Sequence, residues 1–180
     1  TVFHFSETRG YAGLPAGYKT FAGRLGTDAY AVYDKLAAEF ESIVLHGCWA
    51  HVRRKFVDAA EGGDKTAREA VDLIRVLYRI EEEAAELDAD ARLELRKKQS
   101  KPQLDAIKKW LDRHTDAVPK SPLGKAVGYA LDRWTCLVRL LEDGAMPIDN
   151  NAVERAIRPV AIGRKNWLFA GSNKGGKAAA

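Results

Sequence analysis

The sequence lacks the features that mark several classes of protein. Only two of its 180 residues are cysteine, which excludes a disulfide scaffold and fits a reducing compartment. No apolar run approaches the roughly 20 residues that a membrane-spanning helix needs. The first residues do not resemble a signal peptide. We therefore expect a cytoplasmic protein that has no membrane partner.

Three common fingerprints of enzymes are also missing. The sequence contains no Walker phosphate loop, no serine in a nucleophile-elbow motif and no glycine fingerprint of a dinucleotide-binding fold. Its composition is that of an ordinary globular protein, 46% hydrophobic and 30% charged, with a net charge of +4. Glu154 is the last acid, and the six cations that follow it favour an anionic partner. Because the first residue is not Met, we expect the chain to begin inside a longer product.

The first segment, residues 1–61, has an α/β pattern. It combines short β-branched or aromatic runs with stretches in which apolar residues recur at helical spacing. The predicted strands lie at 1–6, 21–27 and 42–45, and the predicted helices at 30–40 and 51–60.

The second segment, residues 62–146, has helical patterns only, so it is predicted to be an all-helical insertion. A long amphipathic helix is expected from Leu123 to Leu141, ended by Gly144. Residues suited to begin helices in this segment are Thr66, Asp88 and Ser121.

The third segment, residues 147–180, returns to the α/β part. It opens with turn residues and a helix start for which Asn151 is the expected N-cap. Pro159 is predicted to end or kink this helix. A loop and a basic tail rich in Gly and Lys are expected after it.

Asp28 stands where a predicted strand gives way to a helix. Its carboxylate is suited to cap that helix by accepting backbone N–H groups. The same position, after the carboxyl end of a strand, is where open α/β sheets place their sites. From position alone, a cap and a metal ligand are both open.

Glu154 has a similar pair of interpretations. With Asn151 as N-cap it occupies the third helical position, as in a capping box. Alternatively it is a second metal-binding carboxylate, since Arg155 and Arg158 share its helical face. Arginines beside a metal site that handles phosphate would hold a nucleic-acid backbone.

Cys48 and His51 form a short Cys-x-x-His motif, followed by the cations Arg53 and Arg54. A structural zinc site needs four ligands, usually in two pairs, and the sequence offers no second pair. We expect Cys48 and His51 to pack beside a strand end and to orient neighbouring groups. The two arginines either cover a solvated helix face or contact phosphate.

A cluster near the C-terminus combines cations, an amide and a large aromatic ring. This combination suits phosphate contact and base stacking, and it equally suits a surface loop anchored by its ring. Its members are Arg164, Lys165, Asn166 and Trp167.

These motifs together resemble the DDE-type transposases of bacterial insertion sequences, specifically the insertion sequence 66 family. The resemblance extends over nearly the whole chain, and its last block is the most specific. The matching stretches are LGTDAYAVY at 25–33, GCWAHVRRKF at 47–56, KSPLGKA at 120–126, and PIDNNAVE at 147–154 with RKNW at 164–167 and GS at 171–172.

The resemblance implies an α/β, ribonuclease-H-like fold with a large all-helical insertion. It implies that Asp28 and Glu154 are the second and third acids of a catalytic triad that binds two Mg²⁺ or Mn²⁺ ions. The first Asp of the family lies on a strand that should precede Thr1, so this chain lacks that ligand and has an incomplete sheet. Cys48 and His51 are similar to a Cys-x-x-His motif that supports such sites.

The implied activity is strand cleavage and transfer at transposon ends. Its partners would be DNA, both the transposon ends and the target, and further copies in a homo-oligomer, in a bacterial cytoplasm and associated with the nucleoid. With two acids of three, we expect this chain alone to be an inactive fragment. The alternative is a non-catalytic remnant that binds DNA or oligomerises.

Overall fold

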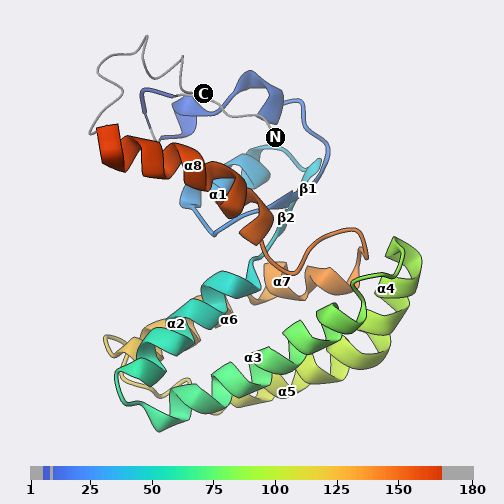
Figure 1. The fold of residues 1–180 in the computed structure, drawn as a ribbon, viewed down its shortest axis with the longest axis vertical. Helices are drawn as coiled ribbons and strands as arrows, with labels where there is room; N and C mark the ends of the chain where they lie inside the picture. Colours follow the sequence, from blue (N-terminus) through green and yellow to red (C-terminus); the bar gives the residue numbers. More distant parts are fainter. Residues whose placement is uncertain (1–5, 9, 168–180) are drawn as a thin grey trace.

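The computed structural model describes residues 6–8 and 10–167, with the backbone alone for residues 160, 161 and 163–167. A small α/β part and a larger helical part lie end to end, and the last helix, α8, starts between them and crosses the α/β part (Figure 1). The α/β part contains two 3₁₀ turns, Tyr11–Gly13 and Ala16–Tyr18, then β1 (Gly23–Gly26), α1 (Ala31–Glu39) and β2 (Ile43–His46). The remaining elements are α2 (Trp49–Glu61), α3 (Lys65–Glu83), α4 (Ala89–Leu95), a π-helical turn (Arg96–Ser100), α5 (Lys101–Asp112), α6 (Pro122–Asp132), α7 (Trp134–Leu137), a 3₁₀ turn (Val138–Leu141) and α8 (Asn151–Trp167).

The predicted α/β character of the first segment is confirmed in its described part. β1 and β2 pair in parallel, from Gly23 opposite Ile43 to Gly26 opposite His46, with α1 as the connection between them. Leu36 of α1 packs with Ile43 and Leu45 in a small core of its own. The strand expected at 1–6 lies almost wholly outside the described residues.

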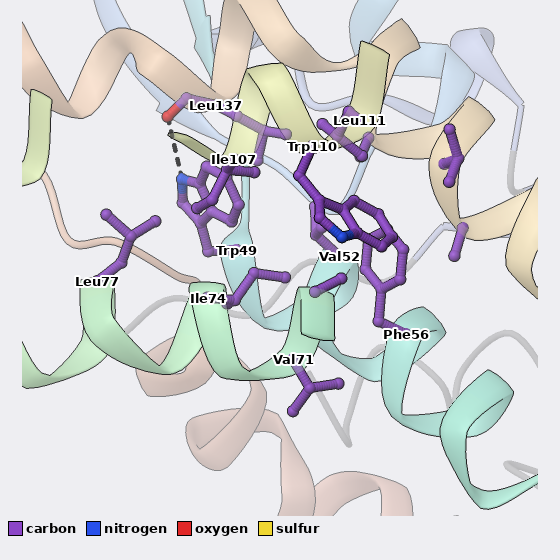
Figure 2. Close-up of a cluster of buried hydrophobic side chains, with 14 of the residues drawn as sticks. Trp49, Val52, Phe56, Val71, Ile74, Leu77, Ile107, Trp110, Leu111 and Leu137 are labelled. Carbon is purple, nitrogen blue, oxygen red and sulfur yellow. Dashed lines mark hydrogen bonds between the residues drawn. The ribbon is translucent and has the colours of Figure 1, made fainter. Parts of the chain in front are cut away.

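The helical part holds the main hydrophobic core. Helix α2 packs against α3 and α6, and α3 packs against α5. Trp49, Phe56 and Trp110 fill the centre of this core, where Phe56 and Trp110 meet edge to face at 5.7 Å between ring centroids (Figure 2). The indole Nε1–H of Trp49 donates to the backbone O of Leu137 at 3.1 Å, so even this buried polar atom is satisfied.

Two of the three helix starts predicted in the second segment are confirmed. The side chains of Asp88 and Ser121 accept backbone N–H groups at the starts of α4 and α6, as predicted. At α3 the prediction is wrong by two residues. Asp64 is the N-cap, and its carboxylate accepts the backbone N–H groups of Thr66 and Ala67. An Asp two residues before Thr66 satisfies the same free N–H groups and places the helix start earlier.

The long helix expected from Leu123 to Leu141 is broken. Helix α6 ends at Asp132, Arg133 leaves the helical conformation, and α7 and a 3₁₀ turn follow. The guanidinium of Arg133 bonds Asp34 of α1, a tertiary contact that helical periodicity does not contain. Gly144 therefore does not end a helix, but passes close to α4.

Helix α8 also differs from its prediction. Pro159 lies inside it, and the helix continues to Trp167, across the loop expected there. The basic tail predicted after it falls outside the described residues. Among the helices described in the structure, none is long and apolar enough to cross a membrane.

Candidate active site at the sheet edge

Parallel pairing fixes where the site residues emerge. The carboxyl ends of β1 and β2 lie at the same edge of the sheet. The backbone N–H of Thr27 donates to the O of His46 at 3.0 Å and extends the pairing toward this edge. Asp28 follows β1 there, and Cys48 follows β2 there. Two sequence blocks 20 residues apart are thus brought to one edge.

Asp28 is exposed and does not cap α1. The helix begins at Ala31 with Tyr30 as its N-cap residue, so the capping interpretation of Asp28 is wrong. One carboxylate oxygen of Asp28 accepts the backbone N–H of Tyr30 at 3.2 Å, closing a short turn before the helix. No ion pair engages Asp28 in the described structure, which leaves oxygen lone pairs open to solvent.

The backbone beside Asp28 is strained and held from the helical part. Ala29 has a φ of 67°, in the left-handed region that residues with a Cβ rarely adopt. The Tyr129 hydroxyl donates to the O of Asp28 at 3.4 Å, and Arg133 donates to the O of Ala29 at 3.5 Å. Arg133 also binds the Asp34 carboxylate at 2.8 Å. The end of α6 therefore braces the segment that presents Asp28.

Cys48 lies at the centre of a polar chain. Its side chain is buried, and its S–H donates to Oδ1 of Asn150 at 2.9 Å. Nδ1 of His51 lies 3.2 Å from the same sulfur. Burial raises the pKa of the Cys48 thiol, so it stays protonated at neutral pH and acts as a hydrogen-bonding group rather than a thiolate.

Glu154 lies against two basic side chains, one of which, His51, also contacts Cys48. Nε2 of His51 lies 3.5 Å from Oε1 of Glu154, an ion pair when the imidazole is protonated. The guanidinium of Arg54 lies 3.7 Å from Oε2. The Glu154 side chain keeps 38% of its surface exposed, so its oxygens remain accessible. The structure thus brings Cys48, His51, Arg54 and Glu154 into one cluster.

The turn before α8 does not form the predicted capping box. The backbone O of Asn150 accepts N–H groups from Val153 and Glu154, so Asn150, not Asn151, precedes the first helical turn. Asn151 instead donates through Nδ2 to Oδ2 of Asp149 at 2.7 Å. The capping interpretation of Glu154 loses its partner, because the Asn151 side chain is engaged elsewhere.

The remaining predicted residues lie outside this cluster. Arg53, Arg155 and Arg158 are exposed, and no ion pair involves them in the described part of the chain. The cluster at 164–167 continues the backbone of α8, and its side chains lie outside what the structure describes.

The sequence matches the family model "Transposase IS66 family" over residues 1–178. The chain belongs to the IS66 family of transposases. Three proteins of Sinorhizobium fredii (strain NBRC 101917 / NGR234) are similar to it. The protein y4qI is 39% identical over 184 residues, y4jD is 36% identical over 180, and y4hP is 35% identical over 182.

These matches cover 98%, 96% and 92% of this IS66-family chain, and 34%, 35% and 32% of the respective relatives. The chain therefore spans about a third of the length of the curated relatives it matches. No solved structure matches it.

The donor chemistry of the IS66-family chain suits a hard divalent cation only in part. The carboxylates of Asp28 and Glu154 supply the oxygen ligands that Mg²⁺ prefers, and both are accessible to solvent. Within the described residues, however, no three His, Cys, Asp or Glu side chains converge as a metal-binding group. A complete metal site needs donors beyond these two carboxylates.

Four residues that hold the site were not singled out by sequence reasoning. Asp149 and Asn150 were visible as a polar run before a helix, a signal that indicated only a turn. Tyr78 fitted the apolar stripe of a helix, and Arg133 had no local signal at all. Their partners lie 71 and 99 residues away along the chain for Tyr78 and Arg133, beyond the reach of local patterns.

Proposed function

We propose that this chain supplies two carboxylates, Asp28 and Glu154, to the active site of a DDE transposase that cleaves and transfers DNA strands at insertion-sequence ends. The observation that carries the proposal is the attachment of Glu154, through His51 and Cys48, at the sheet edge where Asp28 emerges. Sites of open α/β sheets lie at this edge. Membership of the IS66 family supports the same reaction class.

The proposed architecture is ribonuclease-H-like with an incomplete sheet. Residues 1–61 carry the second acid, residues 62–146 form the helical insertion, and residues 147–180 return to the core with the third acid. The parallel β1–α1–β2 unit and the all-helical stretch before α8 support this division. The boundary at 61 is a sequence prediction, and α2 packs on the insertion helices α3 and α6.

In this proposal Asp28 and Glu154 ligate Mg²⁺ or Mn²⁺ together with an acid outside this chain. The bound ions would supply charge stabilisation at the phosphoryl oxygens and an activated water. The protein contributes placement: His51 and Arg54 orient the Glu154 carboxylate, and Tyr129 and Arg133 brace the Asp28 segment. Positioning is the main contribution that a protein makes to phosphoryl transfer.

The same proposal assigns DNA contacts to exposed cations on the two helices that carry His51 and Glu154. These cations are Arg53 and Arg54 on α2, and Arg155 and Arg158 on α8. Exposed arginines on these helices suit contacts to a phosphate backbone. Arg164, Lys165, Asn166 and Trp167 would extend this surface, and assembly of several copies would bring two DNA ends together.

The test is Mn²⁺-dependent nicking of DNA that carries the ends of the element. It compares this chain with a longer polypeptide, extended to the length of the curated relatives. We expect no nicking by this chain alone and nicking by the longer polypeptide. Asp28→Asn and Glu154→Gln should each abolish that nicking, because the metal loses a charged oxygen ligand.

Matched controls are Asp105→Asn and Glu94→Gln, which neutralise exposed acids on α5 and α4 whose ion pairs, among the described residues, are with nearby lysines. Both controls should nick DNA like the parent protein. Nicking that survives Asp28→Asn or Glu154→Gln contradicts the proposal. DNA binding with steep salt dependence and no nicking in any longer polypeptide would favour the non-catalytic remnant.

A further inference from the structure

Tyr78 lies on α3, in the middle of the helical part, yet its hydroxyl reaches the turn that starts α8. It donates to Oδ2 of Asp149 at 3.0 Å. One face of α3 buries apolar side chains, and Tyr78 packs its ring at the margin of the same core. Its hydroxyl is therefore the polar end of an otherwise apolar contact between α3 and this turn.

Asp149 organises the turn that Tyr78 contacts. One oxygen of its carboxylate accepts the backbone N–H of Asn151 at 3.0 Å, and the other accepts Nδ2 of Asn151 at 2.7 Å. The oxygen that accepts Nδ2 is also the acceptor for Tyr78. The carboxylate thus links α3 to the first residue of α8.

The turn is held on its other side by α2. The backbone N–H of Trp49 donates to the O of Ile148 at 3.1 Å, and Cys48 bonds the side chain of Asn150. Glu154 lies one helical turn beyond Asn150, and its backbone N–H donates to the O of that residue. A rotation of the turn about its α2 contacts would therefore change the distance between the Glu154 carboxylate and His51.

The Tyr78 hydroxyl is a permanent donor. Burial, together with the nearby Asp149 carboxylate, raises the pKa of Tyr78 far above neutral pH. The hydroxyl therefore keeps its proton at neutral pH, and a hydrogen bond to a charged acceptor is stronger than one between neutral groups.

We infer that Tyr78 is a positioning residue, which fixes the turn at Asp149 and thereby sets the direction of the Glu154 carboxylate. The inference rests on the proposed function for its catalytic meaning, but its structural claim concerns only this turn. It gives the helical insertion a role in the site: one side chain of α3 sets where α8 begins.

The first test measures amide hydrogen exchange of the 180-residue chain. Tyr78→Phe removes the hydroxyl and keeps the ring, and Asp149→Asn removes the charged acceptor. The control is Tyr18→Phe, in the small α/β part. We expect exchange in the peptide covering 148–155 to become about three- to tenfold faster in the first two variants. Exchange in α5 should not change.

The double variant distinguishes a direct contact from two separate effects. If Tyr78 acts through Asp149, the double variant exchanges no faster over 148–155 than Asp149→Asn alone. Unchanged exchange in Tyr78→Phe overturns the inference. Exchange that accelerates equally in α5 and in 148–155 also overturns it, because the loss is then one of general stability.

The second test uses nicking by the longer polypeptide. Tyr78→Phe should raise the Mn²⁺ concentration needed for half-maximal nicking several-fold, with a smaller fall in the rate at saturating Mn²⁺. A merely structural residue would lower the amount of active protein and leave the half-maximal concentration unchanged, and this result would overturn the inference. Undiminished nicking by Glu154→Gln would refute the proposed function and leave the exchange result to decide the claim about the turn.

Discussion

The protonation state of one buried residue, His46, affects the stability of the fold. Its side chain is 1% exposed, and its Nδ1–H donates to the O of Gly47 at 3.2 Å. Nε2 is buried without a hydrogen-bond partner among the described residues. Burial lowers the pKa of His46, and the nearby cations Arg96 and Arg24 lower it further, against the opposing effects of the Gly47 carbonyl and Asp143. The fold therefore holds His46 neutral.

This environment predicts a pH dependence of stability. A histidine whose pKa is lowered in the folded state binds fewer protons there than in the unfolded chain. Its stabilising effect is complete above the unfolded pKa of about 6.5 and is lost as the pH falls through the lower folded pKa. Urea unfolding between pH 7.5 and 5 should show a smaller decline for His46→Gln than for the parent protein.

The control for this prediction is His114→Gln, since His114 lies in the helical part, where its ring stacks on Trp110. It should keep the decline of the parent protein. An equally steep decline in His46→Gln would assign the pH dependence to other groups.

Single residues also show what the sequence reveals about a site. Residue type and spacing singled out Cys48 and His51 as a motif beside a strand end and left Glu154 open between a cap and a metal ligand, and the family resemblance gave Glu154 its expected role. The ring of Tyr78 fits the apolar face of its helix and packs against the main core. Only the fold reveals that its hydroxyl meets Asp149, because hydrogen bonds across 71 residues leave no local pattern.

At the scale of elements, local chemistry predicted where helices begin and failed where tertiary contacts decide. Asp88 and Ser121 begin helices because their side chains satisfy free N–H groups within three residues. The break after α6 arises at Arg133, whose side chain turns to Asp34. Pro159 does not end α8, although it lacks the N–H for a helical hydrogen bond.

The loop between α7 and α8 approaches α4 so closely that only glycine fits. A Cβ on Gly144 would lie 1.8 Å from the O of Ala89 and 3.0 Å from the backbone N of Leu93. Gly144→Ala must push the loop away from α4, and we expect it to lower the free energy of unfolding by about 1–3 kcal/mol. Urea denaturation measures the change.

Gly128 provides the matched control, because a Cβ there meets nothing within 4 Å. It lies inside α6, so Gly128→Ala should leave the protein unchanged or stabilise it by up to about 1 kcal/mol. Equal free energies of unfolding for the two variants would show that the loop at Gly144 can move away from α4 without destabilising the protein.

At the scale of the whole molecule, the two parts differ in how much they bury. The small core beside the sheet has three buried hydrophobic residues, Leu36, Ile43 and Leu45, whereas the main core joins four long helices around buried tryptophans. The predicted α/β character and the all-helical stretch are both present. The sequence did not predict that α2 would pack in the larger core, because a helical pattern does not say which face of which neighbour it meets.

The difference in buried apolar surface between the α/β part and the helical part predicts that the protein unfolds locally in two stages. Since buried apolar area dominates local stability, amides of β1, β2 and α1 should exchange before those of α3 and α5 in native conditions. Leu111→Ala in the main core should accelerate exchange in α5 and leave the sheet unchanged, because the sheet opens while the main core is still folded. Leu36→Ala should accelerate exchange in both parts, because the sheet opens first on the way to complete unfolding. Simultaneous exchange of the two parts in the parent protein would instead mean a single cooperative unit.

The hydrogen bond between Tyr78 and Asp149 has a consequence for the order of folding. Its two ends are separated by 71 residues, a stretch that contains α4, α5, α6 and α7. Such a contact closes only after the intervening helices have collapsed, because the entropy of closing a long loop opposes it until then. During synthesis Asp28 leaves the ribosome early, yet the contacts that brace its segment come from Tyr129 and Arg133, about 100 residues later. A nascent chain therefore holds neither the Asp28 nor the Glu154 carboxylate in its final place until the helices between Tyr78 and Asp149 have packed.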